Sequence, residues 1–488
     1  MMAVVATAAM TLGELFGSAA GDLQAVEIRD LVLDSRQVER GTAFLAVPGE
    51  TNHGLDFAVD ALARGASAVV FEPSADHGDI SGPAFAVENL KAGLGEIARA
   101  FYGRELEPLS LAGVTGTNGK STVAHLIAEA QTLRGLSCGY VGTLGSGIPP
   151  EISAQALTTP DCLTLHRTLR SLNVNFAAME VSSHALAQNR VAGLKFGTAA
   201  FTNLSHDHLD YHGTLDAYRD AKTRLFTMPE LEAAVLFADD PVSSELAAEL
   251  GPAVRRIDVS LERDADYRAH ILRSDLQGIE LEVLSDGEVG KISSPLIGDF
   301  NAANLLVALG VLNAWDVELL DACDALSRCA GLPGRMQLLG GGDLPSVVVD
   351  YAHTPDALAR VLNTLRDITD GELWCVFGCG GQRDTAKRPA MGSAAARFAD
   401  HIVLTDDNPR DEDPGAIVAD IRRGLVSHPD VWVERDRGRA IADAITRAKA
   451  GDMVVVAGKG HEATQAIAGE VRSFNDATVV AEVLGGLT

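Results

Sequence analysis

Residues 109–133 read LSLAGVTGTNGKSTVAHLIAEAQTL, and this stretch decides what kind of fold the chain can form. A short apolar run enters a loop at residues 113–120, and apolar residues then recur at helical spacing. A strand, a glycine-containing loop and a helix together form an anion site, because loop N–H groups and the positive end of the helix dipole point at one phosphate. The stretch therefore predicts a nucleotide phosphate site, with Lys120 on the outer phosphates and Ser121 on Mg²⁺.

The loop departs from the strict phosphate-loop pattern at one position. Val114 stands where the pattern has its first glycine, and Gly113 and Gly116 flank it. A purely structural tight turn is the alternative interpretation. The preceding strand, the further glycines and the clean helix that follows favour phosphate binding.

Length and composition indicate a multidomain globular protein. At 488 residues the chain is too long for one core, and two to four domains are expected. Its formal net charge is −27, which argues against a nucleic-acid surface because such surfaces need basic patches. A phosphate-bearing substrate must then be held by locally placed Lys, Arg, helix N-termini and Mg²⁺.

The cysteines and the N-terminal residues indicate a cytoplasmic location. Six cysteines show no C-x₂-C pair and no zinc spacing, so we expect free thiols in a reducing compartment. The apolar N-terminus has no basic residue before Arg29 and is interrupted by Glu14, which argues against a signal peptide. No run of 18 apolar residues is present, so no membrane insertion is expected.

The order of apolar runs predicts three α/β domains. Residues 1–107 form a small N-terminal domain, with two short strands around a turn at 31–49 and a helix followed by a buried strand at 57–72. Within it, Asp34, Ser35 and Arg36 fit plain turn chemistry.

Residues 108–332 form a central domain whose apolar strands repeatedly end in polar clusters. These clusters follow the strands at 176–184, 199–212 and 233–240, besides the loop at 113–120. Because ligands bind at the carboxyl ends of parallel strands, the clusters predict one crevice. A β-rich segment is expected at about 254–297, followed by a helix at 298–312 that is entered through two asparagines.

Residues 333–488 form a third domain with the same strand-end pattern. Apolar strands at 346–358, 373–384, 401–413 and 452–462 end in charged or glycine-rich residues, with helical patterns between them. This predicts a second, doubly wound sheet. Two sheets with polar carboxyl ends imply a site between domains, one holding the nucleotide and the other a second substrate.

Several polar residues outside the phosphate loop are candidate ligands of a metal or nucleotide. Glu180 ends a predicted strand and is either a Mg²⁺ ligand or the cap of the next helix. The cluster at 206–212 contains three histidines and could bind zinc, contribute one His to a second Mg²⁺, or be a polar loop. Taken alone, Lys222 fits a solvated helix lysine, and Asn301 and Asn304 fit helix caps.

The turn at residues 407–410 has the chemistry to hold a zwitterion. Arg410 can bind a carboxylate with two hydrogen bonds, while Asp407 or Asn408 can bind an ammonium group or orient Arg410. Arg383 could be a second carboxylate ligand and Glu462 a second ammonium ligand. A surface turn with a local ion pair is the alternative.

Several of these segments resemble one family. GV at 113–114, GTNGKST at 116–122, EVSSHAL at 180–186 and FTNLSHDHLDYHGT at 201–214 are similar to the Mur ligases, ATP-dependent amide-forming enzymes of peptidoglycan precursor synthesis. The resemblance covers nearly the whole chain. It implies a small N-terminal α/β domain, a central mononucleotide-binding parallel sheet and a C-terminal Rossmann-like doubly wound sheet.

The resemblance also assigns catalytic and metal-binding residues. It implies that Lys120, Glu180, His208 and Lys222 are catalytic, and that Ser121, Glu180, His208 and Lys222 hold magnesium. Lys222 would do so as N6-carboxylysine, since carbamylation turns a cation into an anionic oxygen ligand. His206 stands where the family pattern has Arg, which leaves its role open.

Nucleotide and UDP-sugar contacts are likewise implied by matching positions. The residues matching ATP contacts are Gly116, Thr117, Asn118, Gly119, Lys120, Ser121, Asn301, Asn304, Arg335, Asp350 and His353. Those matching contacts to the UDP-sugar dipeptide are Leu33, Ser35, Glu50, Thr51, Asn52, Leu157, Thr158, Thr159, Ser182, Gln188 and Arg190.

DNPR at 407–410, with GCGGQRD at 378–384 and GKGHE at 458–462, resembles the diaminopimelate-adding branch. Gln382 and Ala463-Thr464 depart from that pattern. The branch implies addition of meso-2,6-diaminopimelate to UDP-N-acetylmuramoyl-L-alanyl-D-glutamate through an acyl phosphate, by a monomer whose third domain closes onto ATP. The residues implied to bind diaminopimelate are Arg383, Asp407, Asn408, Pro409, Arg410, Gly458 and Glu462.

Four other functions compete with this hypothesis. An L-lysine-adding Mur ligase or a folylpolyglutamate synthase-like ligase would share the plan, although DNPR and the LDSR segment at 33–36 argue against the latter. A P-loop GTPase switch would need an NKxD segment, which the sequence lacks. A catalytically inactive scaffold would not need Lys120, Glu180, His208 and Lys222.

Overall fold

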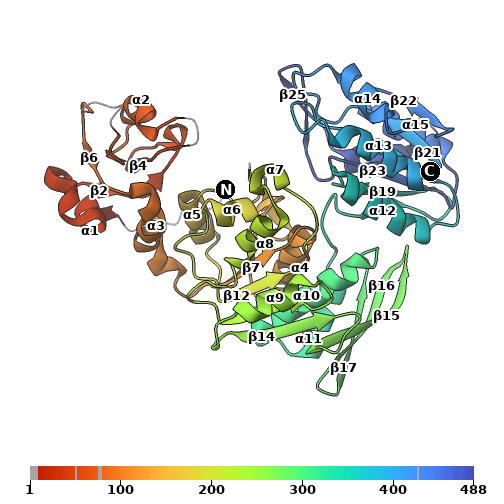
Figure 1. The fold of residues 1–488 in the computed structure, drawn as a ribbon, viewed down its shortest axis with the longest axis horizontal. Helices are drawn as coiled ribbons and strands as arrows, with labels where there is room; N and C mark the ends of the chain where they lie inside the picture. The colour runs from red at the N-terminus through yellow and green to blue at the C-terminus, as the bar shows by residue number, and fades with distance from the viewer. Residues whose placement is uncertain (1–8, 50–51, 75–79, 156, 426–427, 488) are drawn as a thin grey trace. The chain divides into compact units, whose positions relative to one another are not determined.

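The computed structural model describes residues 9–49, 52–74, 80–155, 157–425 and 428–487. The chain divides into two compact units, Met1–Asp258 with Gly310–Asp316, and Val259–Leu309 with Val317–Thr488. Each unit contains parallel sheets with helices between the strands (Figure 1), so the predicted α/β class is confirmed. None of the helices in the described ranges is long and apolar enough to span a bilayer.

The N-terminal part is a parallel four-stranded sheet in the order β3-β4-β5-β6. Helix α2 ends before Gly65, whose φ of +100° is the left-handed conformation that glycine favours, so the predicted helix and strand are both present. The elements of this part are β1 (Met10–Thr11), α1 (Leu12–Phe16), η1 (Gly17–Leu23), β2 (Glu27–Ile28), β3 (Asp30–Val32), η2 (Ser35–Gln37), β4 (Thr42–Ala46), η3 (Gly54–Phe57), α2 (Ala58–Ala63), β5 (Ala68–Phe71), β6 (Ala84–Ala86) and α3 (Leu90–Leu106).

The central part of the first unit is a sheet in the order β10-β9-β8-β11-β7-β12-β13. From β7 the chain moves to one side for β8 and β11 and to the other side for β12 and β13, so the direction of winding reverses next to β7. Ligands of open α/β sheets bind at such a reversal. The elements are β7 (Ser110–Thr115), α4 (Lys120–Leu133), β8 (Cys138–Gly142), β9 (Gly145–Ile148), β10 (Glu151–Ser153), α5 (Cys162–Leu172), β11 (Phe176–Glu180), α6 (Ser183–Ala187), β12 (Thr198–Phe201), α7 (Leu209–His212), α8 (Leu215–Thr223), β13 (Ala233–Phe237) and α9 (Val242–Glu249).

Strand β7 is apolar because both faces of the sheet are covered. Leu111, Ala112 and Val114 are all fully buried or nearly so. Leu111 belongs to a core that also contains side chains of α5, α6 and α9. This burial explains why the sequence shows a continuous apolar run before the loop rather than alternation.

The segment expected to be β-rich at 254–297 is confirmed as strands. They are β14 (Arg255–Ser260), β15 (Tyr267–Asp275), β16 (Gly278–Ser285) and β17 (Glu288–Ser294). Strands β15, β16 and β17 pair antiparallel. Along β17, buried residues alternate with exposed ones. Two helices follow, α10 (Phe300–Ala314) and α11 (Leu319–Ser327).

The C-terminal sheet has the order β18-β19-β23-β20-β21-β22, and all its pairings except β18–β19 are parallel. The predicted doubly wound sheet is therefore present. Its elements are β18 (Gln337–Gly340), β19 (Ser346–Asp350), α12 (Pro355–Asp367), β20 (Leu373–Phe377), α13 (Lys387–Phe398), β21 (His401–Leu404), α14 (Pro414–Arg422), β22 (Val431–Val433), α15 (Arg437–Arg447), β23 (Met453–Ala457), β24 (Thr464–Ile467), β25 (Glu470–Ser473) and α16 (Asp476–Leu487).

Two separate cores cover the faces of this sheet. Along β19, Val348 packs with residues of α12, α13 and α14, whereas Val347 and Val349 pack with residues of α15 and α16. Alternate side chains of a strand point to opposite faces, so each strand contributes to both cores. Helices α12 to α15 are labelled in Figure 1.

The six cysteines are free thiols, and all are buried. The prediction of free cysteines is therefore confirmed. They occupy core positions, where cysteine behaves as a small apolar residue.

A fully buried ion pair joins the two helices on one face of the C-terminal sheet. Arg437 at the start of α15 donates to both carboxylate oxygens of Asp476 in α16, each at 2.7 Å, and both side chains have no exposed surface. A third hydrogen bond from Arg437 goes to the carbonyl of Ala457 at the end of β23, at 3.0 Å. The pair thus ties two helices to the edge of the sheet where β23 ends.

Removing one partner of this pair should be strongly destabilising. Asp476→Asn leaves the Arg437 cation buried without its carboxylate, and we expect a loss of about 3 kcal/mol in the free energy of unfolding. Urea unfolding followed by circular dichroism measures it. Asp443→Asn on the exposed side of α15 is the control and should change stability by less than about 0.5 kcal/mol. Equal unfolding midpoints for the two variants would contradict the prediction.

Candidate active site

The phosphate loop has the backbone conformation that its glycines permit. Gly116 has a φ of +148° and Gly119 a φ of +86°, and Gly119 caps the start of α4. A Cβ atom at position 116 would lie 1.9 Å from Thr202 Oγ1, so only glycine fits there. The predicted strand, loop and helix are thus all present at the reversal point of the sheet.

The loop is held from the neighbouring strand, β12. The side chain of Asn203 accepts from Asn118 N at 3.1 Å and donates to Asn118 O at 3.1 Å, pairing with the backbone as a neighbouring strand would. Thr202 Oγ1 donates to the same carbonyl at 2.6 Å, and Thr117 N donates to the Asn203 carbonyl at 2.8 Å. These contacts fix the loop before any ligand binds.

Two lysines converge on one backbone carbonyl of the loop. Lys120 Nζ donates to Gly116 O at 2.9 Å, and Lys222 Nζ donates to the same oxygen at 2.7 Å. Lys222 is 2% exposed, so it is not the solvated helix lysine that the bare sequence allows. Burial, together with the neighbouring Lys120 ammonium, lowers the pKa of Lys222 well below its ordinary value. Its amine also lies 4.4 Å from the centre of the Tyr218 ring.

Glu180 is buried at the end of β11, next to the strand that enters the loop. Its Oε1 accepts from Tyr140 Oη and from Thr143 N, both at 2.7 Å, and its Oε2 accepts from Thr143 Oγ1 at 3.1 Å. Ser121 Oγ lies 3.5 Å from the same Thr143 hydroxyl. The helix-capping alternative is wrong, because Ser182 caps α6 by accepting from Ala185 N at 3.2 Å.

His208 lies beyond Tyr218 and is half exposed. Its Nε2 is 3.5 Å from Asp207 Oδ2, and its ring centre is 6.1 Å from that of Tyr218 and 4.9 Å from that of His184. Among the described side chains, no three His, Cys, Asp or Glu residues are grouped so that they could hold a metal ion. Of the predicted magnesium ligands, Ser121 and Glu180 are connected by hydrogen bonds through the Thr143 hydroxyl.

Several residues matching UDP-sugar dipeptide contacts form one network beside Glu180. Thr159 Oγ1 donates to Glu180 O at 2.9 Å and accepts from Ser182 N at 3.3 Å, and Arg190 Nη1 donates to Thr159 O at 3.1 Å. Gln188 bonds to Arg190, and Thr158 Oγ1 is 3.1 Å from the Thr143 hydroxyl. Leu157 is exposed.

The N-terminal candidates lie elsewhere in the first unit. Leu33 and Ser35 follow β3, where Asp34 accepts from Arg36 N and pairs with its guanidinium at 2.7 Å, confirming the expected turn. Asn52 is exposed, and its carbonyl accepts from Gly49 N at 2.9 Å. Glu50 and Thr51 lie outside the described residues. Within the described ranges, no hydrogen bond connects this turn to the network around Thr159.

The second unit holds the other candidate ATP contacts. Asn301 and Asn304 are both buried at the start of α10. The Asn301 side chain donates to Ile297 O at 2.9 Å and accepts from the Asn304 amide at 2.8 Å. Asn301 therefore bonds backward to the preceding loop rather than capping the helix N–H groups.

Asp350 and Arg335 lie together at the carboxyl end of β19. Burial raises the pKa of Asp350, and the Arg335 cation and the N–H groups of Met336 and Ala352 oppose that rise. The guanidinium of Arg335 stacks 4.6 Å from the centre of the Tyr351 ring. His353 is exposed, and its Nδ1 is 2.9 Å from Tyr351 O.

The turn at 407–410 adjoins the segment after β23. Asn408 Nδ2 donates to Glu462 Oε2 at 2.8 Å. Gly458 has a φ of +114°, and a Cβ atom at this position would lie only 2.7 Å from Asp407 Oδ2. Burial raises the pKa of Asp407, against the opposing effect of Arg437 and Lys459. These residues form one cluster at one sheet edge, so the surface-turn alternative is wrong.

Both arginines of the predicted amino-acid site border the loop after β20. Arg410 Nη1 donates to Gly381 O at 2.6 Å, and Arg383 is exposed. The loop and the 407–410 turn are tied by Glu412, which accepts from Gln382 N at 2.8 Å and from the buried Arg388 at 2.6 and 2.8 Å. Arg388 lowers the pKa of Glu412 to about 2. Pro409 O accepts from Glu412 N at 3.1 Å.

Comparison with known proteins assigns the whole chain to one family. Three family models match it: the Mur ligase family catalytic domain over residues 27–102, the Mur ligase middle domain over 114–312, and the Mur ligase glutamate ligase domain over 334–460. A relative from Xylella fastidiosa (strain Temecula1), named UDP-N-acetylmuramoyl-L-alanyl-D-glutamate–2,6-diaminopimelate ligase, is 47% identical over 95% of each chain.

The chain belongs to the Mur ligase family. A relative with the same name from Pseudomonas putida is 45% identical over 97% of this chain and 98% of its own length. A solved structure with that name superposes with a TM-score of 0.71 at 36% identity, covering 98% of this chain and 99% of the other. The predicted family is therefore confirmed.

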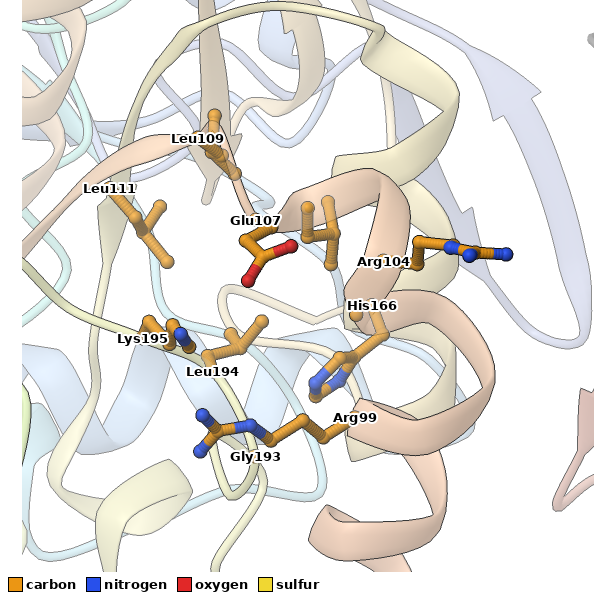
Figure 2. Close-up of a pocket in the computed structure, with 11 residues that line it drawn as sticks. Arg99, Arg104, Glu107, Leu109, Leu111, His166, Gly193, Leu194 and Lys195 are labelled. Carbon is orange, nitrogen blue, oxygen red and sulfur yellow. The ribbon is translucent and has the colours of Figure 1, made fainter. Parts of the chain in front are cut away.

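This Mur ligase also contains a small cavity away from the phosphate loop. It has a volume of about 160 Å³ and lies at the amino end of β7, between the end of α3, His166 of α5 and the loop at 193–195. Figure 2 shows the His166 ring and the Glu107 carboxylate facing its centre and Arg104 pointing away. None of the predicted site residues lines it.

Several residues that build the site escaped the sequence analysis. Tyr140 and Thr143 hold Glu180, and Asn203 holds the loop. Tyr218 contacts Lys222, and Lys459 contacts Glu462. For Tyr140 and Thr143 a signal existed, because GYVGT at 139–143 is one more apolar strand that ends in a polar residue.

Removing the Asn203 side chain should weaken nucleotide binding to this Mur ligase. Asn203→Ala deletes two hydrogen bonds to the Asn118 backbone, each of which contributes about 1 kcal/mol, so we expect the Kd for Mg–ADP to rise about thirtyfold. Isothermal titration calorimetry measures it. Asn175→Ala, an exposed asparagine before β11 at the other end of the sheet, is the control. A Kd for Asn203→Ala equal to that of the control would show that the loop needs no support from β12.

Proposed function

We propose that the chain is an ATP-dependent ligase that joins meso-2,6-diaminopimelate to UDP-N-acetylmuramoyl-L-alanyl-D-glutamate, forming ADP and phosphate. The observation that carries this proposal is the cluster of Asp407, Asn408 and Glu462 beside Arg410, at one edge of the C-terminal sheet. Carboxylates and a guanidinium at one site suit an amino acid with both ammonium and carboxylate groups at its far end. Full-length relatives with that name support the same substrate.

We infer that the three segments matched by family models serve three substrates. Residues 1–107 would bind the UDP-sugar, residues 108–332 ATP, and residues 333–488 the amino acid, and the matched segments fall within these bounds. The network of Thr158, Thr159, Ser182, Gln188 and Arg190 beside Glu180 supports binding of the dipeptide end of the UDP-sugar. Six free buried thiols fit a cytoplasmic enzyme.

ATP would bind with its phosphates on the loop at 116–121. The loop N–H groups and the start of α4 attract the phosphates, and Lys120 would move from the Gly116 carbonyl to the outer phosphate oxygens. Asn301, Asn304, Arg335, Asp350 and His353 would contact the rest of the nucleotide. Arg335 carries the positive charge of this set and stacks on Tyr351, which keeps its guanidinium in place.

The oxygen-rich surroundings of Glu180 fit magnesium. Mg²⁺ prefers hard oxygen ligands, and the carboxylate of Glu180 and the hydroxyls of Ser121, Thr143 and Thr158 are linked by hydrogen bonds. Glu180 and Ser121 would hold the ion, with His208 and a carbamylated Lys222. When bound, magnesium would neutralise the charge on the phosphoryl oxygens.

The chemistry of amide formation explains why the site needs ATP. A carboxylate is a poor electrophile, so its oxygen attacks the γ-phosphorus, ADP leaves and an acyl phosphate forms. The amine of diaminopimelate then attacks the acyl carbon through a tetrahedral intermediate, and phosphate leaves with the C–O electron pair. Lys120 stabilises the charge on the transferred group, and the residues at 407–410 keep the amine oriented.

Phosphate release tests the proposed function directly. With ATP, Mg²⁺ and the UDP-sugar dipeptide, we expect release with meso-diaminopimelate and little with L-lysine, because lysine lacks the second carboxylate that Arg410 and Arg383 would bind. EDTA should abolish release and added Mg²⁺ restore it. Release with lysine alone would replace this proposal by the lysine-adding one, and release with neither amino acid would refute both.

Carbamylation of Lys222 should make activity depend on carbon dioxide. The buried amine donates to the Gly116 carbonyl and lies near the Lys120 ammonium, so adding CO₂ and losing a proton would replace a repelled cation with an anion beside Lys120. We expect activity to fall severalfold in degassed, CO₂-free buffer and to return with bicarbonate. Lys222→Ala should be inactive in both buffers, whereas Lys195→Ala, an exposed lysine, should behave like the wild type. A wild-type rate that is the same in CO₂-free buffer and after addition of bicarbonate would contradict carbamylation.

A further inference from the structure

Lys459 is a buried cation that the proposed reaction does not use. It follows β23 in the segment GKGHE, and its side chain has no exposed surface. Lysine is almost never fully buried unless it is paired. Its partners therefore indicate what the residue does.

The partners of Lys459 are two residues of the proposed amino-acid site. Its Nζ donates to Glu462 Oε2 at 2.7 Å and to Asn408 Oδ1 at 3.2 Å. Asn408 Oδ1 also accepts from Ala466 N at 3.0 Å. Two donors on one oxygen fix the orientation of the amide, so its Nδ2 must face Glu462, and it donates to Oε2 there at 2.8 Å.

This arrangement leaves one carboxylate oxygen of Glu462 for a ligand. Both donors, from Lys459 and Asn408, bind Oε2, and no described residue donates to Oε1. The positive charge of Lys459 also offsets the repulsion between the Glu462 carboxylate and the buried carboxylate of Asp407. Without this cation, the repulsion between the Asp407 and Glu462 carboxylates would be offset less, and the Asn408 amide would lose one of the two donors that orient it.

Diaminopimelate has a group that matches the remaining oxygen. One of its amino groups becomes the new amide, and the other stays an ammonium ion throughout the reaction. An ammonium ion near Oε1 would complete the hydrogen bonding of Glu462. The Glu462 side chain is about one third exposed, and an amino acid without this second ammonium would leave Oε1 without a charged partner in the occupied site, which costs binding energy.

We propose that Lys459 is a positioning residue that holds Asn408 and Glu462 in the orientation that binds the non-reacting ammonium of the amino-acid substrate. It thereby sets the preference for amino acids with that group. This inference rests on the proposed function. Lys459 itself is covered by its partners and does not touch the substrate.

Steady-state kinetics with Lys459→Met tests the inference. We expect the KM for meso-diaminopimelate to rise about tenfold or more, with kcat at saturation and the KM for ATP within about twofold of the wild type. Lys449→Met, which removes an exposed lysine from the same unit, is the matched control and should leave all three constants unchanged. If Lys459→Met fails to fold, Lys459→Gln keeps a polar side chain at the position and should raise the same KM.

A second substrate separates positioning from general loss of structure. 2-Aminopimelate has the reacting amino group and both carboxylates but lacks the second ammonium. The wild-type enzyme should prefer meso-diaminopimelate in kcat/KM, and Lys459→Met should reduce this preference about fivefold or more. A structural defect would lower kcat/KM for both substrates equally, so an unchanged preference, or an unchanged KM, would overturn the inference. A wild-type enzyme without activity on diaminopimelate would instead refute the proposed function.

Discussion

The carbonyl oxygen of Gly116 accepts hydrogen bonds from two lysines, and the geometry of the first unit depends on that convergence. Lys120 comes from the helix that the loop begins, whereas Lys222 comes from α8, more than 100 residues later. Two like charges come this close only if the surrounding structure holds them, and the loop itself is held by Asn203 and Thr202 from β12. Glycine at 116 is required because any side chain would displace Thr202.

The two parallel sheets both place polar groups at the carboxyl ends of their strands, but the groups differ and suit different ligands. In the first unit, backbone N–H groups and lysines gather at the carboxyl end of β7, which suits an anion. In the second, carboxylates and an amide after β21 and β23 lie beside arginines, which suits a zwitterion. The strand-end rule locates both sites, and the side chains at the ends decide the ligand.

The strand ends could be predicted because a buried strand appears in the sequence as a continuous apolar run that stops where the strand ends. Apolar runs mark β7, β11, β19 and β21, and Lys120, Glu180, Asp350 and Asp407 follow them within a few residues. The supports of these residues could not be predicted, since Asn203 lies 85 residues from Asn118 and Thr143 lies 37 from Glu180. No local pattern marks such pairs. Helix capping was the alternative for Glu180 and Asn301, and the structure excludes it, because Ser182 caps α6 and Asn301 donates to Ile297 O.

The two buried lysines show why burial alone does not define a role. Lys222 and Lys459 are both almost completely shielded from water. Lys459 has a carboxylate at 2.7 Å, so its charge is balanced and it can act as a fixed support. Lys222 donates to a carbonyl and lies beside an aromatic ring, and its burial and the nearby Lys120 cation outweigh the favourable effect of the Asp207 carboxylate, so its charge is unfavourable. The unfavourable charge at Lys222 fits the carbamylation proposed for it, whereas the Glu462 carboxylate offsets the charge of Lys459. The group within hydrogen-bond reach of each amine therefore distinguishes the roles proposed for the two lysines.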